Sequence, residues 1–114
     1  MQFILTLHVQ EAGWDQLTPA QQQEGMAAYG AFTQALTEAG ALVGVGRLMP
    51  SGGARTVRTV GGKTVVMDGP FAETKEQMGG YFIIEAADLG AATAWASRCP
   101  ATGHGIVEVR ALRP

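Results

Sequence analysis

The chain has 114 residues, 46% of them apolar and only 16% charged, with a net charge of −2. This length predicts a single domain, residues 1–114, and so little charge indicates a surface partly hidden against a second subunit. The Lys and Arg residues are scattered and no apolar run approaches the roughly 18 residues that span a bilayer, so we expect neither a nucleic-acid nor a membrane partner. Without a visible signal peptide, and with Cys99 as the single cysteine, the chain is expected to be cytoplasmic and reduced.

The first third of the chain predicts a strand followed by a helix. Residues 3–9 place Phe, Leu, Leu and Val on one face and mixed side chains on the other. Thr18-Pro19-Ala20-Gln21 is typical of a helix start, with a capping Thr, a Pro at the first helical position and a Gln that completes a capping box. Apolar residues then recur at helical spacing, and Gly40 is expected to end the helix.

The middle of the chain predicts strands and tight turns. Residues 41–49 indicate a strand whose two glycines suggest a bulge or a close approach of another backbone. Residues 56–60 and 64–67 flank Gly61-Gly62, a pattern typical of a β-hairpin. Asp68-Gly69-Pro70 is expected to end this hairpin.

The last third predicts a strand at residues 81–85, a second helix capped by Asp88 that ends at Cys99-Pro100, and a strand at residues 105–112. Without the hairpin the order is β-α-β-β-α-β, the split ferredoxin-like arrangement. The predicted fold class is therefore α+β, a ferredoxin-like sandwich with an extra β-hairpin. Two helices would cover one face of the sheet, and a homodimer partner would cover the other.

The stretch from Asp68 to Ile84, DGPFAETKEQMGGYFII, resembles the signature of the DGPF proteins within the YCII-related superfamily. The similarity extends to residues 28–32, 95–100 and 103–110. The resemblance implies a ferredoxin-like fold that dimerises into a shared α+β barrel. Superfamily members have been proposed as enzymes because a His and an Asp meet in a pocket, and similar barrels include muconolactone isomerase-like and monooxygenase-like enzymes. DGPF proteins are also often associated with alternative sigma factors.

Asp68 and His104 are the candidate catalytic pair. Asp68 is either a functional carboxylate or the residue that holds its own turn. His104 lies between two glycines, and histidine suits proton transfer near neutral pH, although a loop histidine that bonds a carbonyl would fit the same pattern.

Five further residues are candidate ligand-binding groups. Glu73 and Lys75 lie in the polar run of residues 72–77, which is either a site or a solvated loop; a helical turn there would place Glu73 and Glu76 on one face, and Lys75 would neutralise an anionic substrate. His8, where related sequences often have a nearby Tyr, faces away from the helices and is either a pocket group or a satisfied core histidine.

Arg47 and Tyr81, together with Glu108, are possible inward polar groups on neighbouring strands. Arg47 would clamp a carboxylate. Glu108 would alternatively form a structural ion pair with Arg110 or Arg47.

Three functions stay open. The first is an acid–base enzyme of the isomerase or lyase type, without cofactor or metal, that acts on a small molecule in the dimer pocket. The second is a non-catalytic module that binds a small ligand or a protein such as a sigma factor. The third is purely structural, with the motif serving only to fold the hairpin and the dimer. The glycine pairs match neither a phosphate-binding loop nor a dinucleotide-binding fingerprint, and no residues have zinc-site spacing.

Overall fold

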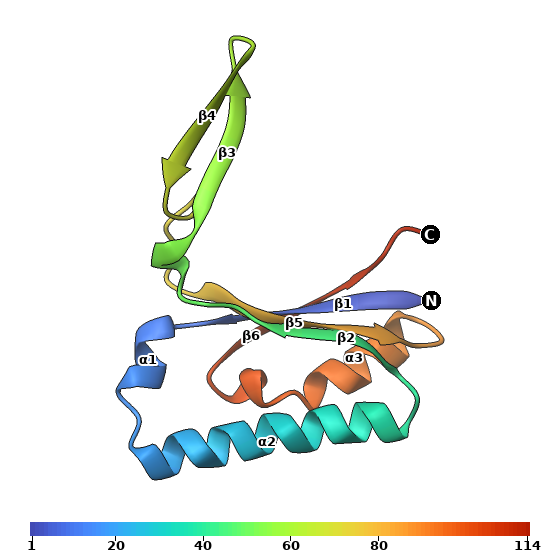
Figure 1. Ribbon diagram of the computed structural model, residues 1–114. Coiled ribbons are helices and arrows are strands. Elements are labelled where there is room, and N and C mark those ends of the chain that lie inside the picture. Colours follow the sequence, from blue (N-terminus) through green and yellow to red (C-terminus); the bar gives the residue numbers. More distant parts are fainter.

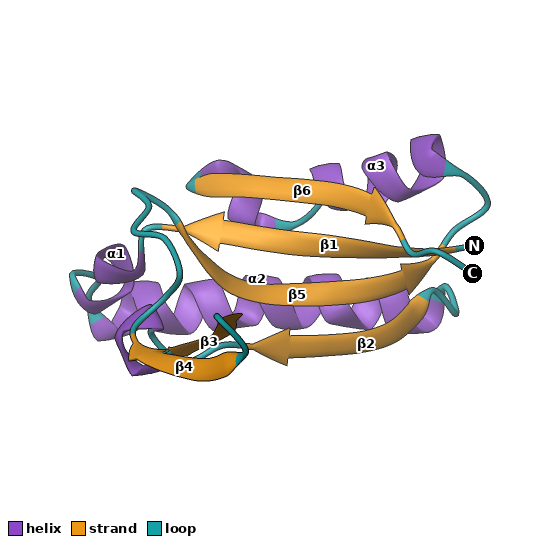
Figure 2. Cartoon of the chain, turned by 90° about the horizontal axis from the view of Figure 1, so that it is seen from above, coloured by secondary structure: helices purple, strands orange, loops and turns teal.

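A computed structural model describes residues 1–114 as an antiparallel sheet with helices on one face and a hairpin that stands away from the other (Figure 1). The four strands of the sheet lie in the order β2-β5-β1-β6 (Figure 2), with bounds β1 Gln2–Val9, β2 Leu42–Arg47, β5 Gln77–Glu85 and β6 Gly105–Ala111. Because β1 is paired with β5 and β6, and β5 also with β2, this is the split ferredoxin-like α+β arrangement that the sequence predicted.

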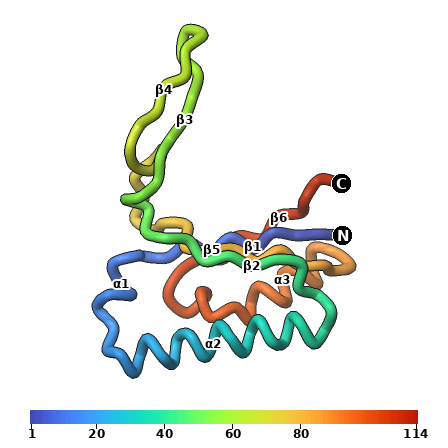
Figure 3. The backbone as a smooth tube through the Cα atoms, viewed as in Figure 1, coloured from blue at the N-terminus to red at the C-terminus, as the bar shows by residue number.

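Helices α2 (Pro19–Glu38) and α3 (Leu89–Ser97) cover one face of the sheet, and the short α1 (Glu11–Asp15) follows β1 at one end (Figure 3). The predicted capping box is present: Thr18 Oγ1 accepts from the Gln21 amide at 3.2 Å, and Gln21 Oε1 accepts from the Thr18 amide at 2.9 Å. Gly40 follows α2 with φ +69°, as expected of a left-handed helix stop. Asp88 caps α3 by accepting from the Ala91 amide at 2.8 Å.

The core lies between the sheet and α2 and α3. Phe3, Leu5 and Leu7 of β1 are buried, and Phe32 of α2 meets Phe82 of β5 edge to face, with ring centroids 5.1 Å apart. The other residues of this core cluster are Leu36, Ala41, Ile84, Ala92, Ala96, Cys99 and Ala101, all apolar except for the Cys99 thiol. None of the helices combines the length and apolar character that a bilayer crossing needs.

Residues 55–68 form a separate hairpin, here called the arm. Its strands are β3 (Arg55–Val60) and β4 (Lys63–Asp68), which pair only with each other. Gly61 and Gly62 join them with φ +57° and +76°, so the turn has the two positive φ values of a type I′ hairpin, which confirms the hairpin prediction.

Three details differ from the sequence prediction. The short α1 and the 3₁₀ turns η1 (Ser51–Gly53) and η2 (Pro100–Gly103) were not predicted, because such short elements leave no periodic pattern. Residues 72–76 form no helical turn, so Glu73 and Glu76 share no helix face. Strand β5 begins at Gln77, not at Tyr81 as predicted. Gly80 makes this possible because it lets the β2 backbone come close: a Cβ on Gly80 would lie 2.8 Å from the Gly46 carbonyl oxygen.

Candidate functional site

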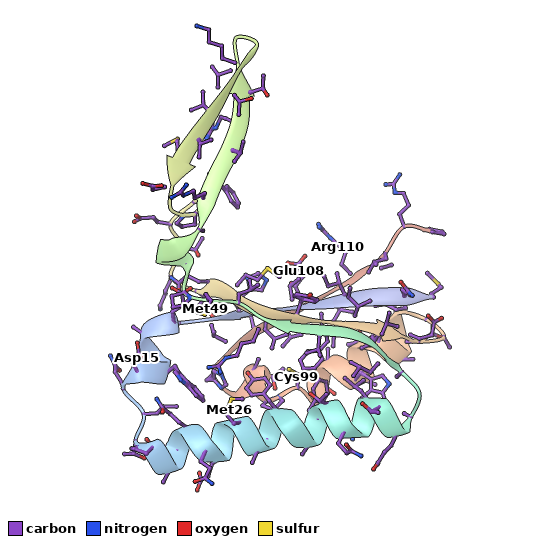
Figure 4. The ribbon with its side chains drawn as sticks, in the orientation of Figure 1. Asp15, Met26, Met49, Cys99, Glu108 and Arg110 are labelled. Atoms are coloured by element: carbon purple, nitrogen blue, oxygen red, sulfur yellow. The ribbon has the colours of Figure 1, made fainter.

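The sheet face that carries no helices is here called the open face. It is formed by alternate residues of the strands, because successive strand side chains point to opposite sides. Figure 4 shows Glu108 and Arg110 on this face, the side from which the arm rises, whereas Met26 and Cys99 lie on the helix side. On strands β1, β5 and β6 the open face consists of Ile4, Thr6, His8, Met78, Tyr81, Ile83, Ile106, Glu108 and Arg110.

Four polar residues lie on three neighbouring strands in the middle of the open face, and we name them the polar centre: Thr6, His8, Tyr81 and Glu108. Thr6 of β1 is directly opposite Tyr81 on β5 and Glu108 on β6. Residues paired in this way have Cβ atoms about 4.5–5.5 Å apart, so the three side chains are neighbours. His8, two residues further along β1, completes the group.

His8 is half-buried and is oriented by a hydrogen bond between its Nε2 and Thr6 Oγ1, 3.0 Å apart. Its neighbours across the sheet are the apolar side chains of Met78 and Ile106. One ring nitrogen is therefore held by Thr6, and Nδ1 makes no hydrogen bond within the chain. A histidine held in this way can exchange a proton with a bound molecule near neutral pH.

Gly46 makes room for the ring of Tyr81. A Cβ on Gly46 would lie 2.5 Å from Tyr81 Cε1 and 2.8 Å from its hydroxyl oxygen, so the phenol ring rests directly against the β2 backbone. The prediction of a close approach at the β2 glycines is confirmed, with a bulge at Leu42/Gly44 as well. The Tyr81 ring and its hydroxyl group therefore lie over β2, on the side of β5 opposite to Thr6 and His8.

Glu108 is paired with Arg110 on the same face, with Oε1 and Nε 3.7 Å apart. Of the two partners considered for Glu108 in the sequence, the structure has Arg110. Both side chains are more than half exposed, so the pair contributes little to stability. It does mean that the Arg110 charge is already partly balanced by Glu108.

Arg47 lies on the helix side, away from Tyr81. Its guanidinium carbon stands 4.9 Å from the centroid of the Trp14 ring, and its Nη1 donates to Met26 Sδ at 3.7 Å. Burial raises the pKa of the nearby Tyr29 hydroxyl to about 12, with Cys99 adding to the rise and Arg47 opposing it. Burial also raises the pKa of the Cys99 thiol.

Asp68 and His104 do not contact each other. Asp68 lies at the base of the arm, where its Oδ1 is 3.4 Å from Arg55 Nε and its side chain is 92% exposed. His104 precedes β6, at the opposite edge of the sheet from the β2 strand that leads to the arm, and its ring makes no hydrogen bond within the chain. Their assignment as a catalytic pair stays a prediction.

Glu73 lines a shallow pocket of about 220 Å³ between η1 and the loop that follows the arm. Its other lining residues include Ser51 and Gln77. Lys75 is exposed in the same loop and makes no ion pair within 4.0 Å. Phe71 of the Asp68–Phe71 motif is 86% exposed, so nothing in the chain itself covers that ring.

Sequence reasoning overlooked Thr6 and Glu11. The signal for Thr6 was present, since it is two residues from His8 on the same strand face. Glu11 left no comparable signal: its carboxylate accepts from the Ser51 amide at 2.7 Å and from Ser51 Oγ at 2.9 Å, and so ties the start of α1 to η1. No three of the His, Cys, Asp and Glu side chains come together as ligands of a metal ion would.

Comparison with known proteins identifies a family and a similar fold. The family model described as "YCII-related domain" matches residues 1–114. An uncharacterised protein of Rhizobium meliloti is 48% identical over 79 residues, which cover 66% of this chain and 62% of that protein. The matched part thus spans less than two thirds of that relative.

One similar structure is 5-chloro-2-hydroxyhydroquinone dehydrochlorinase from Burkholderia phenoliruptrix, in complex with 2,5-dihydroxybenzoquinone. The match has a TM-score of 0.58 and covers 99% of this chain and 94% of the other, at 16% sequence identity. At that identity the likeness shows a shared fold.

Proposed function

Since the chain belongs to the YCII-related family, we propose that it is a small-molecule enzyme of the isomerase or lyase type. In this proposal the polar centre of the open face is the site, and a second copy of the chain covers it to form the dimeric α+β barrel. The observation that carries the proposal is the half-buried His8, hydrogen-bonded to Thr6 at 3.0 Å among apolar neighbours. A cluster of polar groups on a largely apolar face is the usual composition of a small-molecule site.

The chemistry follows from the groups present. Nδ1 of neutral His8 takes a proton from a carbon next to a carbonyl group, and the C–H electron pair forms the double bond of an enolate. The Tyr81 hydroxyl donates a hydrogen bond to the developing oxyanion. In an isomerase His8 returns the proton to another carbon, whereas in a lyase the electron pair expels a leaving group. Thr6 keeps the ring in position, and neither route needs an organic cofactor or a metal.

A cover over the open face supports this chemistry. In the single chain Ile106 is 55% exposed and Met78 is 37% exposed, although both flank His8. Water reaches the site freely in that state and weakens every electrostatic interaction there. A second copy packed on the open face removes this water, and so strengthens the hydrogen bond from Tyr81 to an oxyanion.

The similar fold supports a ligand class. The Burkholderia enzyme is named a dehydrochlorinase and was solved with a dihydroxybenzoquinone, a small oxygenated ring. A hydroxylated ring in its keto form has a carbonyl group beside a CH2 carbon, so it supplies the oxygen that Tyr81 would contact and the proton that His8 would remove. We therefore propose small hydroxylated rings as the first substrates to test, and quinones as ligands.

The test measures binding of 2,5-dihydroxybenzoquinone by titration calorimetry and turnover of a panel of hydroxylated rings. We expect His8→Ala to lower turnover by at least the ~10² that a positioned acid–base group supplies, and Tyr81→Phe to lower it less. Glu24→Gln, an exposed change on α2, is the control. The same panel with Asp68→Asn and His104→Ala tests the other predicted pair.

The outcomes separate the open functions. Loss of turnover in His104→Ala but not in His8→Ala would refute the polar centre as the site. Binding that needs His8, without turnover of any compound, would leave the non-catalytic ligand-binding module. Binding and turnover that are indifferent to both histidines would refute the acid–base proposal.

A further inference from the structure

We propose that the arm of one copy packs against the open face of a second copy and places Arg58 in the second copy's polar centre, where it binds the anionic group of the ligand. The inference rests on the proposed function for the identity of the site, but the placement of the arm has evidence of its own. If Arg58 binds the ligand, the ligand is negatively charged, as a hydroxyquinone in its enolate form is.

The arm is uncovered on both sides. Its apolar residues are exposed by 37% to 62%, and they belong to both faces of the hairpin: Val57, Val60, Val65, Val66 and Met67. An isolated two-stranded hairpin is at best marginally stable in water, so the arm needs a surface to pack on. Its own sheet does not supply one, because the arm stands away from it (Figure 1).

The chain exposes more surface than a compact monomer of its mass, and the excess is large enough for a dimer interface. The chain has 7750 Å² of accessible surface, whereas a compact monomer of 11.9 kDa has about 5,950 Å², an excess of about 1,800 Å². A standard interface buries only about 800 Å² per partner. The radius of gyration of 16.1 Å likewise exceeds the roughly 13 Å of a compact chain of this length. Both values are those expected of a chain that packs against a second copy.

The reach of the arm fits a partner packed on the open face. Arg58 is three residues beyond the base of the arm at Arg55, or about 10 Å along the strand. Sheets packed face to face lie about 10 Å apart, so the Arg58 side chain has the reach to meet a partner's sheet that covers the open face. Lys63, at the tip of the arm, lies further from its own sheet.

The distribution of charge also favours contact between the arm and the body of a second copy. The arm holds three basic residues, Arg55, Arg58 and Lys63, against one acidic residue, Asp68, so it carries +2 and the rest of the chain −4. Arg55 is paired with Asp68, and Arg58 has no ion pair in its own chain. Arg58 shares an arm face with Val65, directly opposite it, and this pairing gives that face both an apolar contact and a free guanidinium group.

The polar centre lacks what Arg58 would supply. Its one neighbouring cation, Arg110, is already paired with Glu108, so no unpaired positive charge faces Thr6 and His8. A guanidinium group binds carboxylate-like oxygens through two parallel hydrogen bonds. The arm of the second copy therefore completes the site with the group that an anionic ligand requires.

Hydrogen bonds close the base of the arm and anchor the turn that precedes it. The Gly69 amide donates to the Ala54 carbonyl at 2.7 Å, and Thr56 Oγ1 donates to the Gly69 carbonyl at 2.9 Å. Glu11 holds the preceding η1 through Ser51. An arm fixed in this way loses little freedom when it meets a partner, which favours association.

Cross-linking tests the placement. In Val65→Cys/Ile106→Cys, one cysteine lies on the Arg58 face of the arm and the other beside His8 on the open face. A short bismaleimide should give a covalent dimer, while the native Cys99 stays unreactive because it is buried. The control Val66→Cys/Ile106→Cys moves the arm cysteine to the opposite face. Only monomeric product, or equal dimer from both variants, would overturn the placement, and sedimentation of the unmodified chain as a monomer would also overturn it.

Titration with 2,5-dihydroxybenzoquinone tests the role of Arg58. We expect Arg58→Ser to weaken binding about tenfold or more, and Lys63→Ser, which removes the same charge from the tip, to leave it unchanged. Equal affinities of the two variants would refute the role. Cross-linked dimer from a chain that binds no quinone would refute the proposed ligand class and keep the arm placement. Quinone binding without cross-linking would refute the arm placement and keep the ligand class.

Discussion

The helix-covered face and the open face of the sheet are made from alternate residues of the same strands. On the covered face of β1, Phe3, Leu5 and Leu7 are at most 6% exposed. On the open face, His8 is only half-buried and Ile106 is 55% exposed. The covered face is therefore where one chain gains its stability, while the open face holds polar groups and apolar surface that a second copy would bury. The stability of the single chain and the proposed site are thus divided between the two sides of one sheet.

The largest difference between the two faces is expected for substitutions at neighbouring residues of β1. Leu5→Ala removes a side chain with 0% exposure, so we expect a loss of about 2–5 kcal/mol in the free energy of unfolding. Ile4→Ala, on the open face, should cost less, and its cost should grow with protein concentration if a second copy covers that face. Urea unfolding at two concentrations measures both, and equal, concentration-independent losses would contradict the division.

The β1–β6 contact offers a second, smaller effect on the backbone that both faces share. A Cβ on Gly105 would collide with the His8 carbonyl oxygen, so Gly105→Ala should push the two strands apart and cost about 1–3 kcal/mol. Gly103→Ala is the matched control, because its Cβ would meet no atom within 4 Å. Thermal unfolding distinguishes the two variants, and similar melting temperatures would show that the strands can relax.

Substitutions at the two β2 glycines distinguish an effect on stability from an effect on ligand binding. In Gly46→Ala the new methyl group must displace the Tyr81 ring, whose far end can move, so we expect a loss of at most about 1 kcal/mol but a clear loss of quinone binding. In Gly44→Ala the nearest atoms, on Ile83, are 4.0 Å away, and binding should persist. Calorimetric titration of both variants tests this. Unchanged binding in Gly46→Ala would remove Tyr81 from the site.

The smallest expected effect is a pH dependence on the helix side. The Tyr29 pKa is raised to about 12, above the value of about 10 expected in the unfolded chain. The folded state thus keeps a proton that the unfolded state loses, and this contribution to stability is full below pH 10 and is lost as the pH rises towards 12. Tyr29→Phe should show a shallower loss of stability over that interval in urea unfolding. Identical slopes for the two proteins would contradict the assignment.

Much of the fold could be read locally. Thr18 and Gln21 encode the helix start through their own side chains, and Gly61-Gly62 encodes the hairpin because both residues adopt positive φ. The alternation in β1 placed His8 on the open face, and the pairing of Thr6 and His8 confirms it. These features depend on contacts within a few residues, which a sequence displays directly.

Arg47 shows where such reading fails. Simple alternation from the core residue Leu42 places Arg47 on the open face beside Tyr81. The bulge at Leu42/Gly44 inserts one extra residue into β2, and a one-residue shift moves every later side chain to the other side. Arg47 consequently packs on Trp14 beneath the sheet.

The sequence by itself therefore determined the family, the order of strands and helices, the caps and turns, and the face on which His8 lies, because each depends on short-range periodicity or a specific motif. Only the tertiary structure decided that Asp68 and His104 lie apart, that Arg47 and Tyr81 occupy opposite faces, and that the arm leaves the sheet. These depend on strand register and on the direction in which chain segments leave the sheet, and long-range pairing sets both.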